Sequence, residues 1–157
     1  MLTLRRSFGI ATLSTLATVA ALVSFGADRA RADDTTFFAV LSGGNEVSGT
    51  GQANAGAPNG YGSGTVVFRN NQRLCYALIV MAIDTPAAAH IHRARAGTNG
   101  PIVVNFEAPA SGNFGSSSGC VTVDAALAKE IRGDPAGFYI NVHSAKFPAG
   151  AIRGQLF

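Results

Sequence analysis

Three histidines, His90, His92 and His143, offer the most direct chemistry in this chain, and they are its only histidines. His90 and His92 flank Ile91 in a strand-like segment, and alternation along a strand places both imidazoles on one side, about 6.5–7 Å apart. His143 stands in a second such segment, on the face opposite the apolar residues. If the two strands lie near each other, the three imidazoles converge on one outward surface patch. Such a set suits copper or zinc, and copper is favoured because no fourth ligand is evident.

An arginine near the C-terminus opens other interpretations of the same patch. Arg153 lies on the polar face of the last predicted strand, and a hairpin would place it beside His143. A guanidinium there would repel a cation and favour an anionic partner or the carboxylate of Glu46. We therefore also consider an ion pair between Glu46 and Arg153. The remaining alternative is that the histidines only satisfy backbone groups of loops.

The sequence gives little support to catalysis. No serine stands in a G-x-S-x-G pattern, and neither an H-E-x-x-H nor a phosphate-loop motif is present. The acidic residues are scattered, and most fit turns, caps or solvated helix positions, so no glycosidase-type pair can be chosen. We therefore predict a protein that is not an enzyme, without hydrolase activity.

The first 32 residues have the pattern of a cleaved secretory signal peptide. Arg5 and Arg6 precede the apolar stretch of residues 8–27, and Ala30-Arg31-Ala32 matches the small-x-small site that signal peptidase accepts. An uncleaved leader acting as an N-terminal anchor is the alternative. Residues 33–157 then form a single domain with no later run long enough to span a bilayer. The prediction is a secreted or periplasmic protein, and the pattern does not choose between the two.

The charge balance after the leader argues against nucleic acid as a partner. The leader carries four of the 12 basic residues and one of the nine acidic residues, which leaves eight of each. The pI near 9.2 therefore comes mostly from the leader, whereas nucleic-acid binding requires a basic face on the folded domain. We expect an extracytoplasmic protein or ligand as partner, and the sequence indicates neither its identity nor an oligomeric state.

Cys75 and Cys120 are the only two cysteines. Each begins a strand-like segment, and an exported chain meets an oxidising environment. We predict a disulfide between them, which would close a loop of about 45 residues and add roughly 3–4 kcal/mol in the chain-entropy model. The alternative is two free thiols at separate core positions.

Short strand-like segments separated by Gly, Pro and Asn predict an all-β fold. One short helix interrupts them, for which Asp124 is a good N-cap and Leu127 and Ile131 share one face. Residues 48–63 and 111–119 are expected to be loops rich in glycine and small residues. Seven or eight strands in about 125 residues favour a Greek-key β-sandwich or small barrel. The expected strands cover residues 35–41, 64–68, 74–83, 88–93, 102–106, 120–123, 138–144 and 151–157.

Three sequence blocks, in order along the chain, resemble a known family. They are LSGGNEV at residues 41–47, AHIHR followed by AGTNGPIVV at residues 89–93 and 96–104, and GFYINVHS followed by FPAGAIRGQL at residues 137–144 and 147–156. Together they resemble the CHRD domain, named after chordin. Two positions depart from the usual pattern: Ala94 replaces a glycine and Ser48 replaces a proline. The motif residues singled out are Gly97, Asn99, Gly100, Pro101, Asn141, Gly154 and Gln155.

The resemblance implies an extracytoplasmic β domain that occurs alone in many bacteria and repeated in chordin, an extracellular antagonist of growth-factor signalling. The family is not a known enzyme family. The two histidine strands are also remotely similar to those of copper/zinc superoxide dismutase, another Greek-key barrel, but the zinc-binding loop of that enzyme has no counterpart here. The sequence therefore predicts an exported, non-catalytic binding or structural module, with a small three-histidine copper or zinc protein as the alternative.

Overall fold

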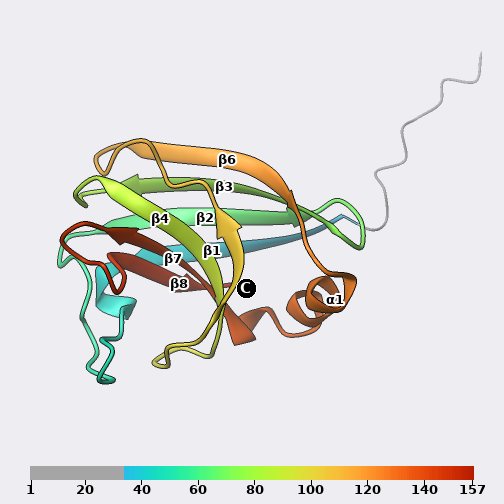
Figure 1. Cartoon of the computed structure of the whole chain (residues 1–157), viewed down its shortest axis with the longest axis horizontal. Helices are drawn as coiled ribbons and strands as arrows, with labels where there is room; N and C mark the ends of the chain where they lie inside the picture. Colours follow the sequence, from blue (N-terminus) through green and yellow to red (C-terminus); the bar gives the residue numbers. More distant parts are fainter. Residues whose placement is uncertain (1–33) are drawn as a thin grey trace, which may run out of the picture.

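The computed structural model describes residues 34–157, so the predicted signal peptide of residues 1–32 lies outside the described part of the chain. Within residues 34–157 the chain forms eight β-strands, one α-helix and two short 3₁₀ segments (Figure 1). The all-β prediction with one short helix is confirmed. The elements are β1 (Thr35–Ser42), η1 (Gly43–Asn45), β2 (Tyr61–Phe68), β3 (Arg73–Met81), β4 (Pro86–Arg93), β5 (Ile102–Phe106), β6 (Gly115–Thr122), α1 (Ala125–Gly133), η2 (Pro135–Gly137), β7 (Phe138–Ser144) and β8 (Ile152–Gln155).

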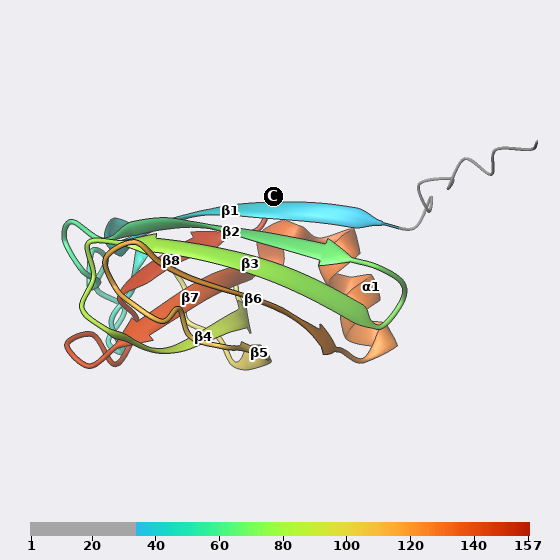
Figure 2. The same ribbon diagram turned by 90° about the horizontal axis from the view of Figure 1, so that it is seen from above.

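The strands are antiparallel and follow the order β5-β4-β7-β8-β1-β2-β3-β6. Figure 2 shows this order folded into two layers, with β5-β4-β7-β8 facing β1-β2-β3-β6. The junction between the layers is narrow: Ser42 of β1 pairs with Arg153 of β8, and Phe38 and Phe157 exchange backbone hydrogen bonds. The edge strands β5 and β6 do not pair in a ladder within the described chain. The result is the nearly closed Greek-key barrel that the sequence predicts.

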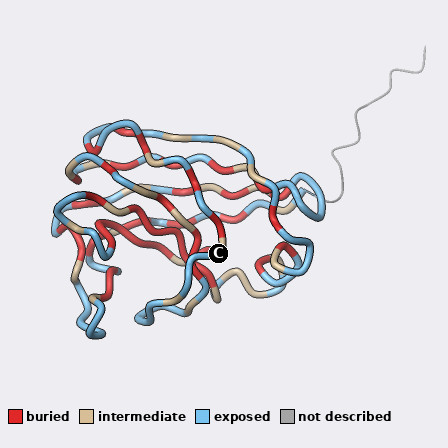
Figure 3. The backbone as a smooth tube through the Cα atoms, viewed as in Figure 1, coloured by how far each residue is buried: buried red, intermediate tan, exposed pale blue. Residues whose placement is uncertain are grey.

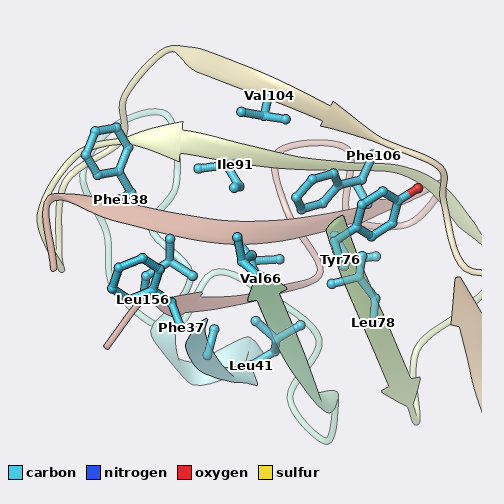
Figure 4. Packing of buried hydrophobic residues seen from close by; sticks show 14 of the residues in the cluster. Phe37, Leu41, Val66, Tyr76, Leu78, Ile91, Val104, Phe106, Phe138 and Leu156 are labelled. Carbon is cyan, nitrogen blue, oxygen red and sulfur yellow. The ribbon is translucent and has the colours of Figure 1, made fainter. Parts of the chain in front are cut away.

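Alternation along the strands fills the space between the two layers with apolar side chains (Figure 4). On β4, Ala89 and Ile91 point inward and are fully buried, and β7 adds Ile140 at the same level. At the open seam, Tyr76 of β3 stacks on Phe106 of β5 with ring centroids 4.0 Å apart. The residues predicted to face the core on the two histidine strands therefore do so. The imidazoles, at the alternate positions, lie on the opposite face.

The predicted helix and its cap are confirmed. The Asp124 carboxylate accepts hydrogen bonds from the backbone N–H groups of Ala126 and Leu127 at 2.8 and 3.4 Å, which satisfies two donors left free at a helix start. Ala128 and Ile131 are fully buried. α1 lies at one end of the sandwich, where it leads from β6 to β7 (Figure 2).

One predicted loop is a strand. Residues 115–119, expected to be part of a Gly/Ser loop, form the first part of β6, which pairs with β3 from Gly115 to Thr122. Without β6, the backbone N–H and C=O groups on that side of β3 would lack partners. Pairing with β3 overrides the weak strand propensity of serine and glycine. β2 likewise begins at Tyr61, so the preceding loop is shorter than predicted.

Although β3 is apolar over most of its length, only one of its two faces is covered. β3 is second from an edge, and Ile79 on its outer face is 50% exposed. Its alternating burial shows that only one face meets the core.

The predicted disulfide between Cys75 and Cys120 is present. The two residues face each other in the β3–β6 ladder. The bridge therefore ties the edge strand β6 to its neighbour, in the layer that does not carry the histidines. Across residues 34–157, no helix is both long and apolar enough to cross a membrane.

Candidate metal centre

The two histidine strands are immediate neighbours. β4 pairs antiparallel with β7, so that His90 lies opposite Asn141 and His92 lies opposite Tyr139, with His143 one diagonal step from His90. The ring centroid of His90 lies 5.6 Å from that of His92 and 5.1 Å from that of His143. The convergence that alternation predicts is therefore present: one nitrogen from each imidazole lies within 4.8 Å of the other two.

The histidine cluster is not an exposed surface patch, which corrects one expectation from the sequence. His92 is only 8% exposed, and every β7 residue except His143 is buried. The parity argument places the imidazoles outside the apolar core, but connections between strands fold back over that face, and the residues of β7 and β8 are mostly buried, as the buried stretches drawn in red in Figure 3 show. Asn45 of η1, for example, donates a hydrogen bond to the backbone carbonyl of Arg153. Strand periodicity carries no information about what covers a sheet.

Loop carbonyls orient two of the three rings. Nδ1 of His92 lies 2.8 Å from the carbonyl oxygen of Gly100, and Nδ1 of His143 lies 3.0 Å from that of Pro148. A carbonyl oxygen only accepts hydrogen bonds, so both Nδ1 atoms carry the proton. The lone pair of each ring is then on Nε2, and this is the arrangement in which a second group fixes the tautomer of a metal-binding histidine.

Three nitrogens of the cluster are buried without a hydrogen-bond partner: Nε2 of His92, Nε2 of His143 and Nδ1 of His90. Buried polar atoms in folded proteins are nearly always paired, so three orphans in one cluster require an explanation. A metal ion would supply a partner to all three at once. Nitrogen ligands bind zinc at about 2.0–2.1 Å, so the rings would close slightly on a bound ion.

His90 and His92 are disposed to be neutral. Burial and, to a smaller extent, the neighbouring His143 and His92 lower the pKa of His90 to about 4. The pKa of His92 is also lowered, chiefly by burial, although its hydrogen bond to Gly100 acts in the opposite direction. Metal ligation requires the unprotonated ring, so these nitrogens need not lose a proton at neutral pH to bind an ion.

The His92 ring stacks on Tyr139, which in turn contacts the guanidinium of Arg153. The ring of Tyr139 is nearly parallel to that of His92, with centroids 4.8 Å apart. The guanidinium carbon of Arg153 lies 3.4 Å from the centroid of the Tyr139 ring. Arg153 is 1% exposed, so a full positive charge is buried one aromatic ring away from a candidate ligand.

The expected ion pair between Glu46 and Arg153 is not formed. The ion pairs within 4.0 Å among residues 34–157 are Arg69–Asp34, Arg93–Glu130 and Arg95–Asp134. Arg153 instead donates to neutral acceptors, including the carbonyls of Arg95 and Thr98.

Glu46 is buried on the same face and is bonded to an amide. Its Oε2 accepts a hydrogen bond from Nδ2 of Asn141 at 3.2 Å, and Oε1 has no partner. Burial raises the pKa of Glu46 to about 7, against the smaller lowering effects of Arg153 and Asn141. The carboxyl and the guanidinium therefore share a face and influence each other, without contact.

The motif residues of the β4–β5 connection hold its carbonyls over the site. Gly97 has φ +76, a left-handed turn that favours glycine. Asn99 donates to the carbonyls of Val47 and Ser48 and so joins this connection to the loop after η1. A Cβ at Gly100 would collide with the carbonyl of Arg93, and Pro101 accepts a hydrogen bond from the backbone of Arg93 at 3.0 Å.

A motif residue of β8 also holds the β4–β5 connection in place. Nε2 of Gln155 donates to the carbonyls of Ala94 and Phe138. Gly154 has no room for a side chain, because a Cβ would collide with the carbonyl of Val40 on β1. The motif thus encodes a loop geometry rather than a second set of ligands.

Sequence reasoning missed Tyr139. Alternation placed it on the face of His143, but tyrosine in a strand is usual and no spacing rule marks it as a partner of His92. The loop carbonyls of Gly100 and Pro148 were missed too, since backbone atoms leave no trace in residue identity.

An eight-stranded, disulfide-bonded β module with three converging imidazoles defines the class of this protein. The family model for the CHRD domain matches residues 37–156, from the first core residue of β1 to the residue after β8. The chain belongs to the CHRD family. No curated protein matches the chain.

Proposed function

We propose that this CHRD domain binds a transition-metal ion, with copper preferred, through Nδ1 of His90, Nε2 of His92 and Nε2 of His143. The observation that carries the proposal is the set of three buried, unpartnered imidazole nitrogens in one cluster. Burial, convergence and carbonyl-fixed tautomers together are what a metal site requires, and loop-bonded structural histidines explain only the Nδ1 contacts.

The donor set favours copper over structural zinc. Structural zinc sites use four protein ligands, and the metal-ligand cluster found among residues 34–157 has three. Copper accepts imidazole ligands and lower coordination by protein groups, with the remaining positions left to solvent. The residues His90 and His143 are partly buried, although the three donor nitrogens themselves are buried.

Metal titration tests the proposal. We expect the purified protein to bind one copper ion tighter than micromolar by isothermal titration calorimetry, and a His90→Ala/His92→Ala double variant to lose that binding. Asn105→Ala is the matched control, because Asn105 pairs with His90 across the β4–β5 ladder and is exposed. A wild-type protein that ignores millimolar copper and zinc would refute metal binding and leave a structural module.

A partner-binding module is the second candidate, and the outer face of the β1–β2–β3 layer favours it. Phe38 is 50% exposed, Val40 66% and Ile79 50%, and exposed apolar side chains gathered on one sheet face are typical of interaction surfaces. An extracytoplasmic protein or ligand would be the occupant. Val40→Glu should abolish capture of such a partner without changing copper affinity.

We further propose that the chain is exported, to the periplasm or the exterior, after cleavage behind Ala32. A CHRD domain and a disulfide bond support this. Mass spectrometry of the protein recovered from its native compartment should give an N-terminus at Asp33, and recovery of the full-length chain would contradict cleavage.

A further inference from the structure

Arg153 has an unusual environment for a buried charge. Its guanidinium donates four hydrogen bonds, to the carbonyls of Arg95 and Thr98, to Asn99 and to Gln155, and all four acceptors are neutral. None of the ion pairs within 4.0 Å in residues 34–157 includes it. Its hydrogen-bonding capacity is thus largely met, while its charge is not neutralised by contact with an anion.

That charge is directed at the histidine cluster through Tyr139. The Tyr139 ring lies between the guanidinium and His92, 3.4 Å from the guanidinium carbon and 4.8 Å from the His92 ring centroid. No water layer separates stacked groups at these distances, and Arg153 is 1% exposed. Screening is therefore weak, and the field of the arginine reaches any ion bound by His92.

The cluster offers no compensating negative charge. Its ligands are three imidazoles without a carboxylate or thiolate, so the site and its arginine together carry one positive charge before metal enters. A divalent ion is repelled by Arg153 twice as strongly as a monovalent ion.

We infer that the histidine centre selects monovalent copper, Cu(I), over Cu(II) and other divalent ions, and that Arg153, acting through Tyr139, is the residue that sets this preference. The inference rests on the proposed function. Arg153 is a positioning and charge-setting residue and touches no metal. Across ~10 Å at an effective dielectric constant of about 20, one unit of charge is worth roughly tenfold in affinity.

Glu46 provides the opposite effect on the same face. Its carboxyl interacts with Arg153 over a distance beyond ion-pair contact, so its ionised form offsets part of the arginine's field. Removing this carboxylate should strengthen the preference for Cu(I), whereas removing the guanidinium should weaken it. Two variants of opposite sign separate an electrostatic role from a merely structural one.

Cu(I) and Cu(II) affinities of the purified protein should be measured at pH 8 by competition with chromophoric chelators, the former without oxygen and with ascorbate. For Arg153→Gln we expect the ratio of Cu(I) to Cu(II) affinity to fall about tenfold. Arg153→Lys should largely retain the ratio, and Glu46→Gln should raise it. The copper reduction potential, measured by voltammetry, should shift in the same directions.

The outcomes are distinguishable. A wild-type protein that binds neither ion would refute the proposed function itself. A wild type that binds copper, with a ratio unchanged in Arg153→Gln, would overturn only the selectivity. If Arg153→Gln fails to fold, Glu46→Gln decides alone, since an unchanged or lowered ratio there contradicts the inference and a raised ratio supports it.

Discussion

At the scale of single residues, the polar groups of this domain are held by neutral partners rather than by opposite charges. His92 and His143 are oriented by carbonyls, Arg153 by carbonyls and amides, and Glu46 by an amide. Because neither Arg153 nor Glu46 forms an ion pair within residues 34–157, each keeps a long-range effect on its neighbours. Protonation of the Glu46 carboxyl should therefore change the free energy of unfolding.

The stability of the fold should depend on pH through Glu46. Its pKa rises from 4.5 to about 7 on folding, so between these values the folded chain holds a proton that the unfolded chain has lost. The free energy of unfolding therefore falls as pH rises from about 4.5 to about 7 and is level above. Relative to Glu46→Gln, the wild type should lose about 3 kcal/mol over this range, measured by urea denaturation at pH 5 and pH 8.

Glu130→Gln is the control for that measurement. Glu130 is an exposed carboxylate paired with Arg93 on the surface, and such a pair contributes little. His90, whose lowered pKa gives the opposite slope, is common to all three proteins and cancels in the comparison. A wild-type curve parallel to that of Glu46→Gln would show that the carboxyl is ionised in the fold at all these pH values.

At the scale of elements, the strands bring the imidazoles together and the connections decide their state. β4 and β7 determine which side the rings face through register. The β4–β5 connection then supplies the carbonyl that fixes the His92 tautomer, and the β7–β8 connection does the same for His143. The geometry of the histidine cluster therefore depends on loop shape as well as on the strands.

Two glycines of the β4–β5 connection should separate loop shape from loop strain. A Cβ at Gly100 collides with the carbonyl of Arg93. Gly100→Ala must therefore shift the backbone at residue 100, including the Gly100 carbonyl that orients His92. We expect copper affinity to fall 10–100-fold, the usual cost of losing an outer-shell partner. Gly97→Ala, at φ +76 with open space around its Cβ, should cost about 1 kcal/mol of stability and leave copper affinity unchanged.

Calorimetric titration and urea denaturation of both variants check this prediction. Equal losses of affinity in Gly97→Ala and Gly100→Ala would show that general loosening of the connection matters, and not the position of one carbonyl.

At the scale of the whole molecule, the two layers have separate tasks. The β5-β4-β7-β8 layer carries the histidines, Glu46's amide partner and Arg153, and the β1-β2-β3-β6 layer carries the disulfide and the exposed apolar side chains. The segment between Cys75 and Cys120 contains β4 and β5, so the disulfide closes a loop that crosses from one layer to the other.

Removing the disulfide should therefore lower stability and leave the histidine cluster intact. The bridge spans a sequence separation of 45, and Cys75→Ser/Cys120→Ser should unfold with about 3–4 kcal/mol less free energy in urea. Copper stoichiometry at 25 °C should be unchanged, because the cysteines lie in the other layer. Loss of copper binding by a variant that is still folded, judged by circular dichroism, would show that the layers are coupled.

Local patterns in the sequence determined most of the fold. Alternation, turn residues and a helix cap are short-range signals, so the strand faces, the α1 cap at Asp124 and the all-β class could be predicted from them. The same period of two placed His90, His92 and His143 opposite the core. The first part of β6, residues 115–119, escaped prediction because its serines and glycines pair only by virtue of β3 beside them.

Tertiary structure alone decided the chemistry of the histidine face. Whether that face was open or covered, which ring nitrogen was protonated and whether Glu46 met Arg153 depended on loops that return from distant parts of the chain. Backbone carbonyls from Gly100 and Pro148 do this work, and a carbonyl is the same in every residue. Periodicity reports the direction of a side chain, whereas burial and hydrogen-bond partners arise only when the segments meet in space.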